Sequence, residues 1–379
     1  MNGAVATSPH PALPRTALGA WNQGVGRALG TFYRRAEIAL VPLDRARRAW
    51  LALLGPMGVR LVRDRELRVG VGALAAVLAA FAMACTAPLT MVVAGPLLLG
   101  LPHVIADVRY LVVRSGLHRS PTFVWLTVPP LALVGFGGGM VAGACAVAGA
   151  VIGARAAPGR RAAGLTAAAL LAGCGALWSP WAEIVFAHVH NFLAVPIWVL
   201  WRRGRDARWT AFAVIAFLGA ATVIASGLVD PWLASGGGVW TTPLDVDPVA
   251  MASSIAPGLT WQTATRLLAL YAFAQSVHYA VWLRLVPDED RERPTPRPFA
   301  ASLRALRDDL GGSPTALALI GCAGIAAWAV LDLDGARTGY LRMTLFHGYL
   351  ELAVLARWAV EGFARTDRGT IAPGPAHAG

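Results

Sequence analysis

Residues 69–113 read VGVGALAAVLAAFAMACTAPLTMVVAGPLLLGLPHVIADVRYLVV, and the only charged side chains in this stretch are Asp107 and Arg109. Such a run is about twice the length of roughly 20 apolar residues that one helix needs to cross the hydrocarbon core of a bilayer. A hydropathy window of about 19 residues divides it into two spans, 69–87 and 88–113. The stretch therefore predicts two consecutive membrane-spanning helices.

The rest of the chain has the same character. Of its 379 residues, 56% are hydrophobic and 14% are charged, which is more apolar than the core of a soluble domain requires. We therefore predict an all-α, polytopic transmembrane bundle of about ten helices. The further spans are expected at 121–138, 139–155, 162–178, 180–201, 209–229, 260–286, 315–332 and 340–360.

The basic residues predict the orientation of these spans. All 33 basic residues are arginines, and their clusters follow the even-numbered spans. Because cytoplasmic loops carry the excess of arginine, every even span is expected to run from outside to inside, with both termini in the cytoplasm. The segment 230–259 contains three aspartates and no arginine, so it is expected outside.

Three regions are predicted along the chain. Residues 1–68 alternate aromatic and aliphatic side chains with arginines, which is typical of amphipathic helices lying on an anionic membrane surface and contacting its lipids. A solvated, disordered arm is the alternative, and no signal peptide is expected. Residues 69–362 form the transmembrane domain. Residues 363–379 are expected to be a disordered cytoplasmic tail.

Composition also excludes two classes of function. The arginines border apolar spans and form no patch interleaved with aromatic residues, so no nucleic-acid partner is expected despite the net charge of +12. The four cysteines lie singly inside apolar runs, which predicts neither a disulfide framework nor a thiolate metal site.

Five of the eight histidines lie inside the predicted spans. Counting back from the first cytoplasmic arginine of each span puts His103, His190 and His347 ten to twelve residues inside the membrane. At about 1.5 Å per residue this is some 15–18 Å, close to the midplane. His278 reaches a similar depth if its neighbouring arginine extends to the interface. Together with His188, these residues predict one shared polar site, because an unpartnered histidine in hydrocarbon is costly.

Polar residues at helical spacing accompany the histidines. His103 and His347 each have a carboxylate at i+4, on the same helix face, as expected for outer-shell groups that orient a ligating imidazole. His188 and His190 are about 200° apart on an ideal helix, so one of them is expected to be a structural or outer-shell histidine. The predicted outer-shell residues are Asp107, Glu183, Gln275 and Glu351.

Neutral imidazoles with outer-shell carboxylates favour iron(II), with copper or zinc as alternatives. Haem b is the main competitor, but bis-histidine ligation uses only two histidines, whereas four helices contribute here at one depth. A proton or ion pathway through the same residues and purely structural hydrogen bonding are the alternatives to metal or cofactor binding.

The stretch Gly100-x-Pro102-His103-x-x-x-Asp107 and the span containing Tyr271, Phe273 and His278 resemble the Brp/Blh-type bacterial β-carotene-cleaving dioxygenases. The resemblance covers short motifs, and Val104 departs from the glycine expected after the motif histidine. It implies an enzyme of the bacterial cytoplasmic membrane in which histidines hold catalytic iron that splits β-carotene into two retinals. The implied ligands are His103, one of His188 or His190, His278 and His347.

These features predict a membrane non-haem iron oxygenase that uses O₂ on a hydrophobic substrate, a carotenoid or another lipid, entering from the bilayer. A redox partner, if required, would dock on the positive cytoplasmic face. Two other classes remain open: a haem-binding electron-transfer protein, and a metal or proton transporter that uses the His/Asp/Glu cluster as a relay.

Overall fold

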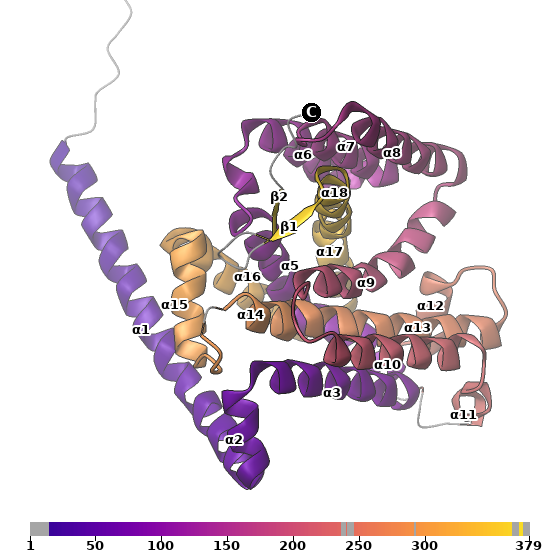
Figure 1. Cartoon of the computed structure of the whole chain (residues 1–379), viewed down its shortest axis with the longest axis horizontal. Helices are drawn as coiled ribbons and strands as arrows, with labels where there is room; N and C mark the ends of the chain where they lie inside the picture. The colour runs from indigo at the N-terminus through magenta and orange to yellow at the C-terminus, as the bar shows by residue number, and fades with distance from the viewer. Residues whose placement is uncertain (1–14, 236–239, 241–245, 292, 366–370, 374–379) are drawn as a thin grey trace, which may run out of the picture. The chain divides into compact units, whose positions relative to one another are not determined.

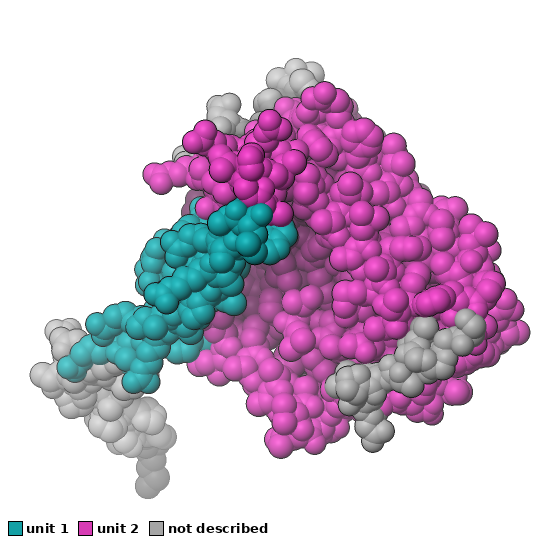
Figure 2. Space-filling model, turned by 90° about the horizontal axis from the view of Figure 1, so that it is seen from below, with its two compact units in different colours: residues 1–53, 297–317 teal, residues 54–296, 318–379 magenta. Residues whose placement is uncertain are grey.

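The structure is a computed structural model that describes residues 15–235, 240, 246–291, 293–365 and 371–373. It is helical apart from one pair of short strands, which confirms the predicted all-α bundle (Figure 1). The chain divides into two compact units, shown in Figure 2. Unit 1 comprises residues 1–53 and 297–317, and unit 2 comprises residues 54–296 and 318–379.

Unit 1 pairs two helices that are far apart in the sequence, α1 (Arg15–Leu53) and α15 (Phe299–Leu310). The carboxylate of Asp44 accepts hydrogen bonds from the backbone N–H of Phe299, at 3.0 and 3.1 Å, and so satisfies a donor at the start of α15. Unit 1 thus differs from the predicted arm, 1–68. Unit 1 includes residues 297–317, and residues 54–68 of the predicted arm belong to unit 2.

Seven helices in the described part of the chain are long and apolar enough to cross a membrane. This agrees with the predicted integral membrane protein. They are Arg65–Thr86 (α3), Pro88–Val113 (α4, η1, α5 and η2), Pro121–Ile152 (α6, η4 and α7), Pro158–Trp178 (α8), Trp181–Trp201 (α9), Ala207–Ala225 (α10) and Gly312–Leu331 (α16).

The fourth predicted span, 139–155, folds back on the third predicted span, 121–138. Helices α6 (Pro121–Leu133) and α7 (Gly139–Ile152) are joined by η4 (Val134–Gly138), where the backbone turns at Gly137 with φ 95°. A Cβ at Gly149 would lie 2.1 Å from the carbonyl oxygen of Leu126, so the two helices are in direct backbone contact. The pair is a tight hairpin.

Two predicted spans are absent from the seven for different reasons. Helix α13 (Trp261–Ala280) continues through η5 (Val281–Leu285) into α14 (Val286–Glu289), but it is more polar than a lipid-facing helix because it lies in the core beside α3, α9 and α10 (Figure 1). The span predicted at 340–360 is broken at Leu345 into α17 (Leu333–Thr344) and α18 (Phe346–Glu361).

The remaining elements are short. The segment expected outside contains α11 (Asp230–Ser235) and α12 (Pro248–Ile255), and the tail expected to be disordered contains β1 (Phe363–Arg365) and β2 (Ile371–Pro373). These strands pair antiparallel, with Ala364 opposite Ala372. The other short helices are α2 (Gly55–Arg63) and η3 (Leu117–Arg119).

Buried ion pairs join α3, α9 and α14 at one end of unit 2. The Arg68 guanidinium donates to both carboxylate oxygens of Asp288, at 2.9 and 3.0 Å. Arg202 donates to Glu289, and it also reaches Glu66 on α3 at 2.5 Å. Each buried charge has a partner, which is the condition under which such a network can be accommodated inside a folded protein.

Candidate metal centre

Helix α5 (Leu101–Asp107) carries two of the candidate residues, His103 and Asp107, on one face. It lies between two π-helical segments, η1 (Pro96–Gly100) and η2 (Val108–Val113). Wide turns of this kind occur mostly at functional sites. A Cβ at Gly100 would lie 2.3 Å from the hydroxyl oxygen of Tyr340, so glycine is needed for the close approach of α17 to this helix.

Four histidines from four helical segments, one of which is α5, lie close together. They are His103 of α5, His190 of α9, His278 of α13 and His347 of α18. The ring centroids of neighbouring pairs lie 4.8 to 6.0 Å apart. The shared depth expected from the sequence thus corresponds to a real cluster, which we call the histidine cluster.

His188 lies outside this cluster. Its Nε2 lies 3.0 Å from the carbonyl oxygen of Ile255, and its ring packs edge-on against Tyr271, with centroids 5.3 Å apart. The side chain therefore points away from His190, as the angle of about 200° between the two positions on a helix requires. The sequence did not decide between His188 and His190, and in the structure His190 is the member of the histidine cluster.

Among the carboxylates, Asp107 enters the cluster itself. One ligand atom each from His103, Asp107, His278 and His347 can be chosen so that all lie within 4.8 Å of one another, and these four residues are buried. Asp107 was expected to orient a ligand from outside. The structure instead places it among the candidate ligands.

Glu351 contacts a different histidine from the one that its spacing suggested. Its Oε1 accepts a hydrogen bond from the indole N–H of Trp282 at 2.6 Å and lies 3.3 Å from Nε2 of His278. His347, four residues before it on α18, is not its partner in these interactions. Both His278 and Glu351 are fully buried, so this contact supports His278 from a neighbouring helix.

Two other predicted outer-shell residues lie elsewhere. Glu183 accepts a hydrogen bond from the backbone N–H of Met140, at the start of α7, at 3.4 Å. Gln275 points its amide toward the hydroxyl of Tyr271, at 3.5 Å. Within the described part of the chain, no hydrogen bond joins either side chain to a histidine of the cluster.

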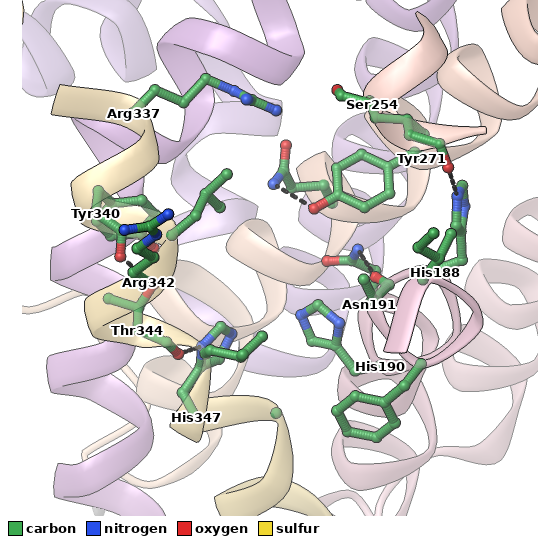
Figure 3. Close-up of a pocket in the computed structure, with 18 of the residues that line it drawn as sticks. His188, His190, Asn191, Ser254, Tyr271, Arg337, Tyr340, Arg342, Thr344 and His347 are labelled. Atoms are coloured by element: carbon green, nitrogen blue, oxygen red, sulfur yellow. Dashed lines mark hydrogen bonds between the residues drawn. The ribbon is translucent and has the colours of Figure 1, made fainter. Parts of the chain in front are cut away.

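Backbone carbonyls orient two of the histidines. Nδ1 of His347 bonds the carbonyl oxygen of Thr344, which the break between α17 and α18 leaves accessible (Figure 3). Nδ1 of His103 lies 3.3 Å from the carbonyl oxygen of Leu99. With the proton held on Nδ1, each ring directs Nε2 toward the cluster, which is the usual arrangement of ligating imidazoles.

The cluster contains buried polar atoms that have no hydrogen-bond partner among the described residues. They are Nε2 of His103, both ring nitrogens of His278 and both carboxylate oxygens of Asp107. The contact between His278 and Glu351 is close but lacks hydrogen-bond geometry. Unsatisfied groups of this kind are costly. A bound divalent metal would satisfy them, so the donor set fits a metal with nitrogen and oxygen ligands.

A cavity of about 350 Å³ opens beside the cluster. His103, His190 and His347 form one end of it, and the ring of Tyr279 packs on His103 with centroids 4.6 Å apart. Figure 3 shows His190 and His347 facing each other, with Arg337 and Ser254 at the opposite end. The cavity gives a second molecule access to the histidines.

Sequence reasoning missed several residues of this region. Tyr340 and Thr344 lie seven and three residues before His347, the same helical spacings that singled out Glu183 and Gln275, so the same reasoning could have found them.

The comparisons with known proteins give no relative on which to build. The chain matches no protein-family model, no curated protein and no solved structure.

Proposed function

We propose that the chain is a membrane-embedded non-haem iron oxygenase of the bacterial cytoplasmic membrane, with both termini in the cytoplasm. The observation that carries the proposal is the histidine cluster: four imidazoles from four helical segments, with the partnerless carboxylate of Asp107 among them, next to a cavity. The residues that would hold the metal are His103, His190, His278, His347 and Asp107.

Iron(II) bound by these residues would supply the activation of O₂. The chain itself would bury the donor atoms and position the substrate. His103, His278 and Asp107 are almost completely buried, so water is kept from the donor atoms. The cavity wall contains Phe186, Tyr271 and Tyr279, which would hold an apolar chain or polyene against the histidines.

The geometry favours iron held by several histidines over haem. Four imidazole rings with centroids 4.8 to 6.0 Å apart leave no room among them for the plane of a porphyrin. The finer proposal, oxidative cleavage of β-carotene into two retinals, rests on the Brp/Blh resemblance of the sequence motifs.

Expression in a bacterial host that accumulates β-carotene tests both levels of the proposal. Central cleavage halves the conjugated system, so cells with the wild-type protein should lose their orange colour and contain retinal. His347→Ala should leave the cells orange. His118→Ala is the matched control, because His118 is exposed on the short helix η3, and it should bleach the cells as the wild type does.

Metal analysis and an absorption spectrum of the purified protein separate the alternatives. Orange cells with iron in the protein would mean an iron enzyme with another hydrophobic substrate. A haem Soret band would replace the proposal with electron transfer. Protein without iron or haem would leave the relay or transporter as the leading function.

A further inference from the structure

The cavity beside the histidine cluster has two chemically different ends. The histidines form one end, and the side chain of Arg337 extends across the other (Figure 3). Between them the wall is formed largely by aromatic and aliphatic side chains, among them Tyr271, Tyr340 and Leu341. An apolar passage with a cation at its far end suits a molecule that has the opposite charge at one end only.

Arg337 has little to pair with inside the protein. It is half-buried on α17, and its one hydrogen bond in the described part of the chain runs from Nε to the carbonyl oxygen of Val92, at 3.4 Å. Among the described residues no ion pair of Arg337 is found, and the carboxylate whose charge acts on it, that of Asp334 on the same helix, is exposed. The N–H groups of its two terminal nitrogens are therefore available to donate hydrogen bonds to a ligand in the cavity.

Other arginines of unit 2 show the usual arrangement. Arg68 and Arg202, which are more deeply buried, bind carboxylates on neighbouring helices. Arg342, on the same helix as Arg337 and also beside the cavity, is exposed, so water can solvate its charge. A half-buried guanidinium without an anion is unfavourable, and its planar fork matches a carboxylate with two parallel hydrogen bonds.

We propose that the ligand of this cavity is an amphiphile, an apolar chain ending in a carboxylate, and that Arg337 binds the carboxylate. Arg337 and His347 are ten residues apart on α17 and α18, and Leu345 between the two helices has helical dihedral angles, so about 15 Å of axial rise separates them. The atoms that meet the histidines then lie well along the chain and not next to the acid group. The assignment rests on the proposed iron oxygenase, and for the same site it names a substrate class other than β-carotene, which has no carboxylate.

Retinoic acid and its methyl ester form a suitable pair of probes, because they share a polyene and differ in charge. Binding to the detergent-solubilised full chain is measured by quenching of tryptophan fluorescence, for the wild type and for Arg337→Gln, Arg337→Lys and Arg342→Gln. The quantity compared is the ratio of the two apparent affinities within each protein, in which partition into micelles cancels between proteins.

The wild type should prefer the acid by about tenfold or more, as expected for charge-assisted hydrogen bonds. Arg337→Gln should remove this preference, Arg337→Lys should keep most of it, and Arg342→Gln should keep all of it. The proposal is overturned if the wild type shows no preference, if Arg337→Gln keeps it, or if Arg342→Gln alone removes it. Competition by millimolar inorganic phosphate would overturn it too, since it would indicate a site for a free anion.

The iron content of each variant distinguishes this proposal from the proposed function. Arg337 lies away from the histidine cluster, so all three variants should bind as much metal as the wild type. If Arg337→Gln loses the preference for the acid but binds as much metal as the wild type, the result supports Arg337 as the residue that binds the carboxylate. Absence of metal from every protein, with the preference intact, would contradict the oxygenase and leave the amphiphile site standing.

Discussion

Two histidines that are neighbours in the sequence serve different purposes. His190 faces His278 and His347 with ring centroids 5.6 and 5.2 Å away, whereas His188 binds the carbonyl oxygen of Ile255. Both line the cavity, so proximity to the cavity does not separate them. What separates them is the direction of the side chain, which places only His190 in the histidine cluster.

The first prediction at this scale concerns metal binding by these two residues. His190→Ala should lower bound iron by tenfold or more, because it removes one donor from a small set, as His103→Ala and His278→Ala should. His188→Ala should retain iron at the wild-type level. Elemental analysis of the purified proteins measures both. Equal iron in the His190 and His188 variants would show that His190 is not a ligand.

At the scale of elements, helix breaks and wide turns position the site. Helix α5 is held between η1 and η2, and the turn at Leu345 separates α17 from α18 just before His347. π-helical segments of this kind are frequent at functional sites. Elsewhere in unit 2, ion pairs join the ends of α3, α9 and α14.

This network makes a prediction about stability. Asp288→Asn removes the partner of Arg68, a buried cation, and should destabilise the protein by about 3–5 kcal/mol, as the loss of one member of a buried pair does. Thermal unfolding in detergent should show a clearly lower midpoint. Asp206→Asn is the matched control, because its partner Arg208 is 82% exposed, and its midpoint should stay at the wild-type value. Equal midpoints for the two variants would mean that the buried pair contributes nothing.

At the scale of the whole molecule, the arginine bias makes a prediction about topology. Reporter fusions at Arg161, in the first turn of α8, and at Arg205, between α9 and α10, should report the cytoplasm. A fusion at Gly237, which lies outside the described residues, should report the exterior. An external signal at Arg205 would reverse α9 and contradict the depth assigned to His190.

The sequence by itself determined that this is a helical membrane protein, where most of its helices lie, and that histidines gather at one depth. Hydropathy and charge are properties of each segment and its distance from the interface, so they can be read without neighbours. It also excluded that both His188 and His190 face one centre, because 3.6 residues per turn fixes their relative angle.

Only the tertiary structure decided which way each helix is turned and what it meets. Asp107 joins the cluster while Glu183 binds the start of α7, and Glu351 supports His278 instead of His347. Arg337, on α17, lines the same cavity as the histidines of α5, α9 and α18. Helical periodicity gives the angles between residues of one helix, but the absolute rotation of that helix and its partners depend on packing against segments far away in the sequence.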